Sequence, residues 1–172
     1  MVLEILRRMH IDSWIPDYVV GLTRGGLVPA NMISQYLEVP METLKVSLRD
    51  ENSEPESNLW MAEDAFGYIP QELRGESGTV TDPALRKKIL VVDDINDTGN
   101  TFNWIYKDWP SGCMPNETHV WNAVWNHSVR FAVLVDNSSS ASKVTMNYSA
   151  RTINKHEDPS WIVFPWESWW TP

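Results

Sequence analysis

Apolar and polar residues along this chain follow spacings that change from helical to strand-like and back. Apolar residues at helical spacing predict a first helix over Val2–Met9. The short apolar run Tyr18–Leu22 predicts a strand, and it ends in a turn at Thr23–Gly26. A second helix is expected over about Pro29–Leu37, because proline is tolerated in a first helical turn, and Thr43–Ser47 predicts a second strand.

The apolar run Ile89–Val92 is typical of a strand that is buried on both faces. A helix is expected over about Thr101–Asp108, and His119–Trp125 and Phe131–Val135 predict further strands. Strands that alternate with helices imply a sheet that is mostly parallel and covered on both faces. The expected fold class is therefore α/β, a mostly parallel sheet flanked by helices.

Two segments lack a regular period. Residues 47–88 are polar and acidic, and structureless loops longer than about 12–15 residues are often lids or binding loops. Within this stretch we expect a small hairpin that docks on the body, formed by Trp60, Met61, Phe66 and Tyr68; a disordered insertion is the alternative. From Ser138 onward the chain is rich in serine and asparagine and then aromatic, which predicts a separate cap over one end of the sheet.

Composition and charge narrow the class of protein. The 172 residues suit one domain with a sizeable core, and ten tryptophans are an unusually large number. The net charge of −9 argues against a basic nucleic-acid surface and against attraction to anionic membranes. Cys113 is the only cysteine, and no apolar run approaches the roughly 18 residues of a membrane span. We therefore expect a cytoplasmic single-domain protein that binds neither nucleic acid nor membrane.

The segment Ile89–Thr101 carries the candidate chemistry. Asp93 and Asp94 fall at the carboxyl end of the buried strand, where ligands bind in open α/β sheets. The loop Asp97–Thr101 offers backbone N–H groups at a helix start, a glycine and two threonine hydroxyls, which together suit a phosphate. The carboxylates suit sugar hydroxyls or a metal ion.

Two other kinds of acidic site are alternatives for this segment. A calcium loop starting at Asp94 is rejected, because it would need a bidentate glutamate at its twelfth position, where Ile105 stands, and it should follow a helix. Receiver-type magnesium sites also place paired acids at a strand end, but they have no adjacent phosphate loop.

Three segments together resemble the type I phosphoribosyltransferases, which bind 5-phosphoribosyl pyrophosphate (PRPP). The run VVDDINDTGNT is similar to the ribose-phosphate signature of that family. Val20–Ala30 resembles the pyrophosphate loop of the purine members, especially the xanthine–guanine phosphoribosyltransferases, and Trp161–Glu167 resembles their base-binding end. The segments occur in family order and span nearly the whole chain, so the resemblance implies the type I phosphoribosyltransferase fold.

The resemblance implies roles for residues that would bind PRPP. Asp93 and Asp94 would bind the ribose hydroxyls directly or through Mg²⁺, which is the implied cofactor. The 5′-phosphate would be cradled by the loop of Asp97, Thr98, Gly99, Asn100 and Thr101. Pyrophosphate would be held by Thr23, Arg24, Gly25 and Gly26.

The resemblance also implies roles on the side of the base. Asp97 would lie near the base N7 and act as the catalytic proton acceptor, Trp161 would stack on the purine, and Ile162 would present backbone groups to its edge. Residues 47–88 would form a flexible loop that closes over PRPP and excludes water, and residues from about 138 to 172 would form a base-binding hood. The remaining tryptophans of that region are expected to pack the cap or an oligomer interface: Trp166, Trp169 and Trp170.

One feature of the purine members is missing from the sequence. Those members usually carry a lysine, just after a strand beyond the phosphate loop, that contacts the 6-oxo group of the base. The candidate places here hold Asn126-His127 or Asp136-Asn137, and the next lysine is Lys143. The preference for a 6-oxopurine is therefore left open.

These observations lead to one expected function and two alternatives. We expect a Mg²⁺- and PRPP-dependent phosphoribosyltransferase of nucleotide salvage that acts on a purine base and forms a homo-oligomer, a dimer or a tetramer. The first alternative keeps the fold but changes the acceptor to a pyrimidine or another nucleophile. The second is a non-catalytic PRPP- or nucleotide-sensing protein that kept the site and lost turnover.

Overall fold

The computed structural model describes residues 1–46, 58–75 and 80–167. Helices and strands alternate through most of these ranges. The helices are α1 (Val2–Ile11), α2 (Leu27–Leu37), α3 (Leu59–Phe66) and α4 (Asn100–Gly112). Short 3₁₀ helices are η1 (Gln71–Leu73), η2 (Pro83–Leu85) and η3 (Thr118–Ala123). The strands are β1 (Tyr18–Thr23), β2 (Met41–Lys45), β3 (Ile89–Asn96), β4 (Val129–Asn137) and β5 (Tyr148–Ile153).

The five strands form one sheet in the order β2-β1-β3-β4-β5, and every pairing is parallel. Val20 of β1 lies opposite Glu42 of β2 on one side and Val91 of β3 on the other. Because all strands run the same way, their carboxyl ends meet at one edge of the sheet. The predicted α/β class with a mostly parallel sheet is thus confirmed.

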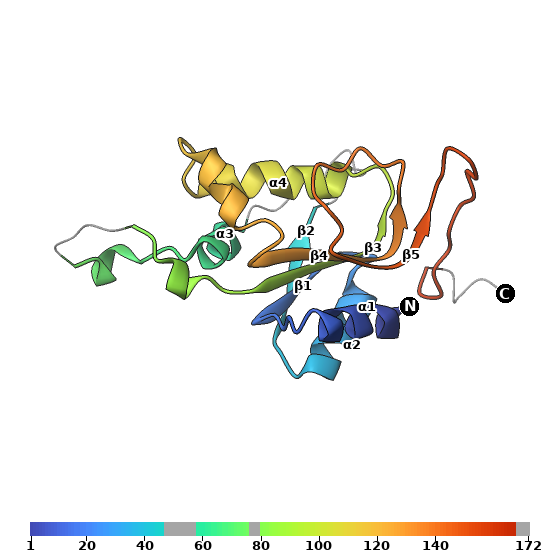
Figure 1. The fold of residues 1–172 in the computed structure, drawn as a ribbon, viewed down its shortest axis with the longest axis horizontal. Coiled ribbons are helices and arrows are strands. Elements are labelled where there is room, and N and C mark those ends of the chain that lie inside the picture. The colour runs from blue at the N-terminus through green and yellow to red at the C-terminus, as the bar shows by residue number, and fades with distance from the viewer. Residues whose placement is uncertain (47–57, 76–79, 168–172) are drawn as a thin grey trace.

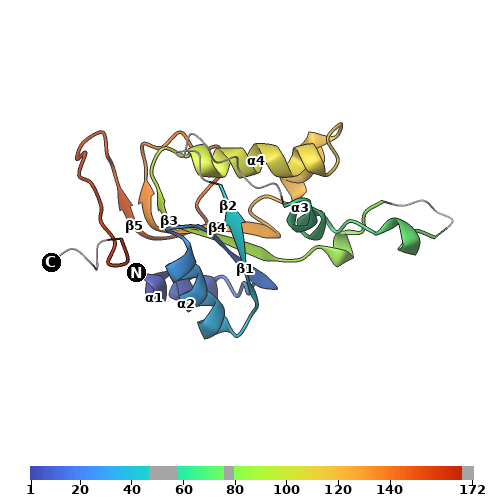
Figure 2. The same ribbon diagram turned by 180° about the vertical axis from the view of Figure 1, so that it is seen from behind.

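Helices cover both faces of the sheet. Figure 1 shows α3 and α4 on one face and α1 and α2 on the other, and Figure 2 shows the same layers from behind. Successive strand residues point to opposite faces, so Ile89 and Val91 of β3 join the α3/α4 core, whereas Leu90 and Val92 join the α1/α2 core. Burial on both faces accounts for the unbroken apolar run that predicted this strand.

The sequence predicts the starts of α1 and α2 well and the end of α4 less well. In α1, Ile5, Leu6 and Met9 are buried at helical spacing. Helix α2 begins after Gly26 and carries Pro29 in its first turn. Helix α4 extends beyond the predicted end at Asp108 to Gly112. No helix within the described ranges has the length and apolar character needed to cross a membrane.

Two predicted elements are wrong. The predicted strand His119–Trp125 is mostly the 3₁₀ helix η3, because Trp121 turns inward onto Phe66 and Trp125 at ring-centre distances of 5.3 and 5.1 Å. The predicted hairpin of Trp60, Met61, Phe66 and Tyr68 is wrong as well, since the first three of these residues lie in α3. Only an isolated antiparallel bridge joins Tyr68 to Thr81 within the described residues.

Part of the 47–88 segment is the helix α3. Met61, Ala65 and Phe66 are buried in the α3/α4 core, so this part of the segment belongs to the body of the domain. Residues 47–57 and 76–79 lie outside the described residues. The predicted closing loop over PRPP therefore stays a prediction and cannot include the core-packed residues of α3.

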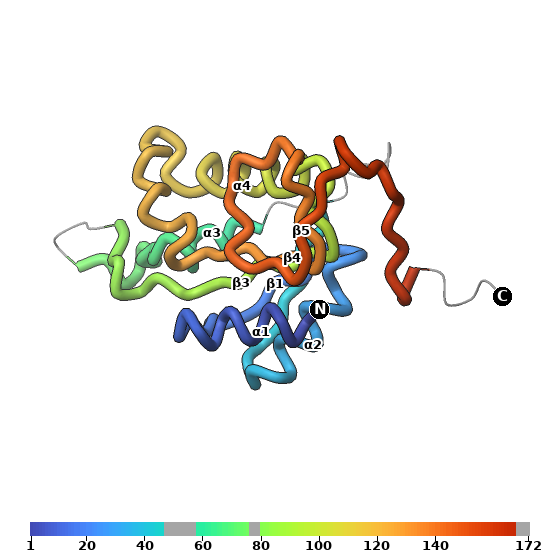
Figure 3. The backbone as a smooth tube through the Cα atoms, turned by 45° about the vertical axis from the view of Figure 1, so that its right-hand side comes forward, coloured from blue at the N-terminus to red at the C-terminus, as the bar shows by residue number. Residues whose placement is uncertain are grey.

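The predicted cap from Ser138 onward also needs correction. Residues Tyr148–Ile153 are the edge strand β5 of the main sheet and not part of a separate cap. Tyr148 is buried, and its hydroxyl and the Asp12 carboxylate both bond to the guanidinium of Arg130, which ties β5 to β4 and to the end of α1. Figure 3 shows the segment after β5, in red, beside this edge of the sheet. A hood is therefore restricted to residues after Ile153.

Candidate active site

The order of the strands creates a crevice at the centre of the sheet. The chain leaves β1 for α2 on one face and leaves the adjacent β3 for α4 on the other face. The two loops therefore diverge at the carboxyl ends of the strands, and ligands of open α/β sheets bind at such a topological switch point. A cavity of about 940 Å³ lies there, and it is lined by the carboxyl-terminal residues of β1, β2 and β3 and by residues that follow β1, β2, β3 and β5.

The loop after β1 approaches the acids of β3 closely. A Cβ atom on Gly25 would lie 2.0 Å from the Asp94 carboxylate, so only glycine admits that carboxylate at this place. A Cβ atom on Gly26 would lie 2.3 Å from the carbonyl oxygen of Val92. Gly25 lines the cavity with Thr23 and the exposed Arg24, and the Thr23–Arg24 peptide bond is cis. Gly26 lies outside the cavity lining and serves the packing of α2 on β3.

The two adjacent acids in the carboxyl-terminal half of β3, which extends beyond the predicted apolar run to Asn96, point to opposite faces of the sheet. Asp94 is only 8% exposed and lies on the side of α2, against Gly25. Asp93 lies on the side of α4, and one of its carboxylate oxygens accepts a hydrogen bond from the backbone N–H of Asp94 at 3.0 Å. Both residues line the cavity, so they offer oxygen atoms to a ligand from its floor.

The loop after β3 is shaped by one glycine. Gly99 has a φ of 85°, and a Cβ atom there would lie 2.4 Å from the backbone nitrogen of Ser142. Thr98 and Asn100 are exposed on either side of it, and Asn100 begins α4. The first N–H groups of a helix have no intrahelical acceptor, so this end of α4 is suited to an anion.

The segment after β5 supplies the remaining wall. Trp161 is 71% exposed, whereas Phe164 is buried and its ring stacks on Trp166 at 5.0 Å. The backbone N–H of Phe164 donates to the Glu167 carboxylate at 2.8 Å, which closes a tight turn. Trp161, Ile162 and Phe164 all line the cavity. An exposed indole beside a polar cavity offers a surface on which an aromatic ligand can stack.

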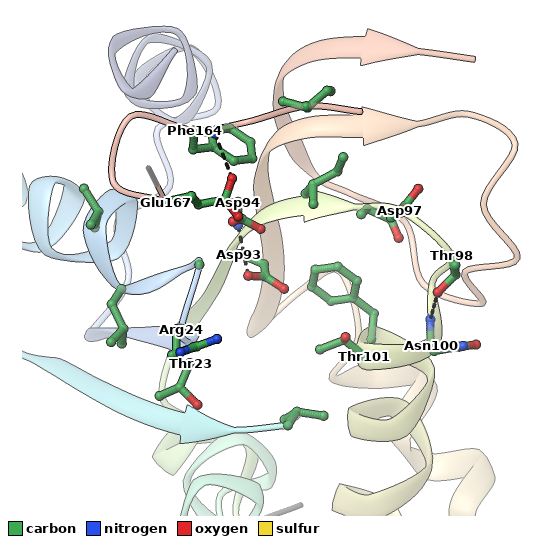
Figure 4. A pocket seen from close by; sticks show the side chains of 18 of the residues that line it. Thr23, Arg24, Asp93, Asp94, Asp97, Thr98, Asn100, Thr101, Phe164 and Glu167 are labelled. Atoms are coloured by element: carbon green, nitrogen blue, oxygen red, sulfur yellow. Dashed lines mark hydrogen bonds between the residues drawn. The ribbon is translucent and has the colours of Figure 1, made fainter. Parts of the chain in front are cut away.

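Asp97 lies where these walls meet. One of its carboxylate oxygens is 3.0 Å from Nζ of Lys155, which follows β5, and both side chains are about one-fifth exposed, at 21% and 17%. The same Nζ lies 5.5 Å from the ring centre of Trp161. Figure 4 shows Thr23 and Arg24 on one side of the cavity, Asp97, Thr98 and Asn100 on the other, and Asp93 and Asp94 between them.

The sequence profile of the phosphoribosyl transferase domain matches residues 3–169. The chain belongs to this family. Xanthine phosphoribosyltransferase 1 of Saccharomyces cerevisiae is 22% identical to it, over 89% of this chain and 78% of the relative. Xanthine-guanine phosphoribosyltransferase of Cereibacter sphaeroides is 27% identical, over 92% of this chain and 76% of the relative.

A solved structure agrees with this family in fold. The purine phosphoribosyltransferase of Pyrococcus horikoshii superposes with a TM-score of 0.58 at 20% identity, over 96% of this chain and 85% of the other. The type I phosphoribosyltransferase fold expected from the sequence is thereby confirmed, and the protein is a phosphoribosyltransferase. Its cytoplasmic location and homo-oligomeric state stay predictions.

The phosphoribosyltransferase fold brings together nearly all the site residues predicted from the sequence. With Gly26 as the exception, the predicted residues line one cavity: Thr23, Arg24, Gly25, Asp93, Asp94, Asp97, Thr98, Gly99, Asn100, Thr101, Trp161 and Ile162. Three charged residues of the same lining were not predicted: Lys45, Lys155 and Glu167. Lys45 is the last residue of β2, which lies beside β1. The rule that ligands bind at the carboxyl ends of the strands, which pointed to Asp93, therefore also applies to Lys45.

Proposed function

We propose that this phosphoribosyltransferase transfers 5-phosphoribose from PRPP to a purine base and releases pyrophosphate. The observation that supports this best is the convergence of two phosphate-suited loops and an exposed tryptophan on one cavity. The two curated relatives support the base class, since their names refer to xanthine and guanine. We call Thr23–Gly26 and Asp93–Thr101 the donor half of the site. We call Lys155 and Trp161–Glu167 its acceptor half.

The donor half would hold PRPP through three groups of contacts. The N–H groups and hydroxyls at the start of α4, from Thr98 to Thr101, suit the 5′-phosphate. The carboxylates of Asp93 and Asp94 suit the ribose hydroxyls. Thr23, Arg24 and Gly25 suit pyrophosphate, because the guanidinium adds positive charge and the glycine lets a backbone amide approach.

The charges of the cavity fit a bound Mg²⁺ ion. The described lining contains three cationic side chains and four carboxylates, and the latter are Asp93, Asp94, Asp97 and Glu167. A polyanionic substrate such as PRPP needs further positive charge in such a site. Mg²⁺ is commonly held by one or two carboxylates together with substrate oxygens and water, a set that Asp93 and Asp94 can begin. When bound, the ion would neutralise charge on the pyrophosphate leaving group.

The chemistry requires little covalent participation of the protein. A nitrogen of the base attacks C1′ of the ribose, the bond to pyrophosphate breaks, and its electron pair leaves with the pyrophosphate. Positive charge develops on the sugar, next to Asp93 and Asp94. Asp97 would accept the proton that the base gives up. Rate enhancement then comes from positioning of the two reactants and from fixed charges.

A direct test measures pyrophosphate release from PRPP and Mg²⁺ with a panel of bases: xanthine, guanine, hypoxanthine, adenine, uracil and orotate. Release with one or more purines, and its loss when Mg²⁺ is removed by chelation, is the expected result. Release only with a pyrimidine would replace the proposed acceptor. PRPP binding without release for any base would support the sensing protein instead.

A further inference from the structure

The segment that follows β4 packs against the loop that leads into α4. We call residues 138–143, which come directly after β4, the post-β4 segment. The backbone N–H of Ala141 donates to the carbonyl oxygen of Thr98 at 3.1 Å. Ser142 lies so close to Gly99 that a Cβ atom on the glycine would be 2.4 Å from the serine nitrogen. Ala141 and Ser142 are not among the described residues that line the cavity, so the post-β4 segment supports the loop from the side away from the cavity.

Two successive carbonyl groups of the loop are fixed on that side. The carbonyl oxygen of Thr98 is bound by Ala141, and that of Asp97 accepts from Nδ2 of Asn137 at 2.9 Å. Asn137 is 5% exposed and outside the described cavity lining, so it serves the loop and not the base. The C=O and N–H of a planar trans peptide point in opposite directions, so the N–H groups of Thr98 and Gly99 face the cavity. Successive N–H groups that point the same way form a concave site for an anion.

One side chain of α4 holds the post-β4 segment in this place. Nδ2 of Asn103 donates to the carbonyl oxygen of Ala141 at 2.9 Å, and its Oδ1 accepts from the backbone N–H of Lys143 at 2.7 Å. The backbone N–H of Asn103 donates to the carbonyl oxygen of Gly99 at 2.9 Å. Because the asparagine amide both donates and accepts, this one residue joins the start of α4 to the segment behind the loop.

Asn103 can affect a ligand only through its neighbours. Asn100, Thr101 and Phe102 line the cavity, whereas Asn103 is not among the described lining residues. The 5′-phosphate of PRPP is remote from the reacting C1′ atom, so a site for it contributes binding and alignment. A loop that is already held in its binding conformation avoids the free-energy cost of ordering it when the ligand binds.

We propose that Asn103 is a positioning residue of the transfer reaction, because it holds the post-β4 segment against the loop and thereby keeps the N–H groups of Thr98 and Gly99 turned toward the 5′-phosphate. This inference rests on the proposed binding of PRPP and adds to it a residue that lies outside the cavity. Asn103 acts only through the backbone of Gly99, Ala141 and Lys143.

The role of Asn103 is tested with Asn103→Ala and two partial ligands, ribose 5-phosphate and inorganic pyrophosphate. Ribose 5-phosphate carries the 5′-phosphate alone, whereas pyrophosphate would bind at Thr23–Gly25. In calorimetry with Mg²⁺, the variant should bind ribose 5-phosphate about 3- to 10-fold more weakly, the size of one ordinary hydrogen bond, and pyrophosphate as the wild type does. In steady-state kinetics the KM for PRPP should rise and the KM for guanine should stay near the wild-type value.

Asn147→Ala is the matched control. The side chain of Asn147 also joins two segments, since its Oδ1 accepts from the backbone N–H of Phe131 at 2.9 Å and its Nδ2 donates to Oδ1 of Asn126 at 3.2 Å. It is not among the described residues that line the cavity. This variant should lower the melting temperature without changing either affinity. Asn103→Gln keeps the amide on a longer side chain and should weaken ribose 5-phosphate binding less than Asn103→Ala.

The outcomes separate this inference from the proposed function. If Asn103→Ala is less stable but binds ribose 5-phosphate and PRPP as the wild type does, Asn103 is only a structural residue and the inference is refuted. An equal loss of affinity for ribose 5-phosphate and pyrophosphate would refute it as well, because the whole cavity would then be disturbed. If Asn103→Ala does not fold, Asn103→Gln replaces it in the same comparison. If the wild type neither binds PRPP nor transfers phosphoribose, the proposed function fails and this inference fails with it.

Discussion

The two halves of the cavity are built in different ways. In the donor half, glycines let backbone and side chains approach so closely that a Cβ atom would collide: Gly25 with Asp94, and Gly99 with Ser142. In the acceptor half, position depends on side-chain contacts of Lys155 and on the exposed ring of Trp161. A glycine whose Cβ position is already occupied allows almost no substitution, whereas contacts between side chains can be changed residue by residue. We infer that the donor half fixes the common substrate and the acceptor half sets the choice of base.

The largest loss of turnover is expected from Asp97→Asn, because Asp97 belongs to the loop of the donor half and pairs with Lys155 of the acceptor half. Removal of a positioned proton acceptor should lower kcat about 10²-fold or more. Steady-state kinetics with PRPP and guanine measure this value. Asp158→Asn, on an exposed residue outside the cavity lining, is the control. Wild-type turnover in Asp97→Asn would remove Asp97 from its proposed role.

Gly25→Ala tests the close approach of the Gly25 backbone to the Asp94 carboxylate in the donor half. The new Cβ atom would force the Asp94 carboxylate away, and a displacement of about 1 Å can cost about 10²-fold in rate. We expect weaker PRPP binding and lower kcat/KM in a protein that still folds, measured by calorimetry and kinetics. Gly75→Ala is the control, since a Cβ atom there meets nothing within 4 Å. Normal PRPP binding by Gly25→Ala would contradict the importance of this contact.

Gly26→Ala tests whether this second glycine of the same loop serves the stability of the fold rather than ligand binding. Its Cβ atom would press on the backbone carbonyl of Val92, which cannot rotate away as a side chain can. Overpacking of this kind costs about 1–3 kcal/mol of stability. Denaturant unfolding should therefore show a larger loss of stability for Gly26→Ala than for Gly25→Ala. The reverse order would mean that the roles assigned to the two glycines are exchanged.

Trp161→Ala tests the acceptor half alone. Stacking of a base on an aromatic side chain is worth about 1–3 kcal/mol, so the KM for guanine should rise about tenfold or more while the KM for PRPP stays near the wild-type value. The melting temperature should change little, because Trp161 is mostly exposed. Trp60→Ala, on a half-exposed tryptophan outside this cavity, is the matched control. A loss of stability without a change in KM would make Trp161 a packing residue.

The smallest effect concerns the α3/α4 core, at the far end of α4 from the cavity. Burial, with a smaller contribution from Glu63, raises the pKa of the Cys113 thiol from 9.0 to about 11. Below pH 9 the thiol is protonated in both the folded and the unfolded chain. Between pH 9 and about 11 the unfolded chain loses this proton first, so the free energy of unfolding should fall as pH rises. Cys113→Ala should flatten this decline in denaturant titrations; an equal slope in both proteins would contradict it.

The same contrast accounts for what could be predicted from the sequence. The donor half comes from two short contiguous runs, and its glycines and acids are constrained by backbone packing, so a motif shows them. Lys155 was missed because β5 was missed: only the first two residues of Tyr148–Ile153 are buried, and an edge strand with this pattern has no clear apolar period. Because the sequence does not indicate β5, the rule that ligands bind beyond the carboxyl ends of the strands could not be applied to Lys155, which stands two residues after this strand.

The errors elsewhere in the fold have a similar cause. Trp121 and Val124 are both buried, and the apolar residues around them predict a strand, although the 3₁₀ helix η3 and the residue that follows it bury them equally well. Helix α3 stands between polar runs, and its burial depends on α4, which lies far along the chain. Tertiary contacts, rather than local propensity, determine both segments.

The most direct test of the account is the stoichiometry of the reaction of the wild-type protein with PRPP, Mg²⁺ and guanine. Nucleotide is quantified by mass spectrometry and pyrophosphate by a coupled assay in the same samples. We predict one nucleoside 5′-monophosphate for each pyrophosphate released. Pyrophosphate without nucleotide would mean that water reaches C1′ and that the acceptor half does not bind this base, and neither product with any purine would contradict the proposed transfer.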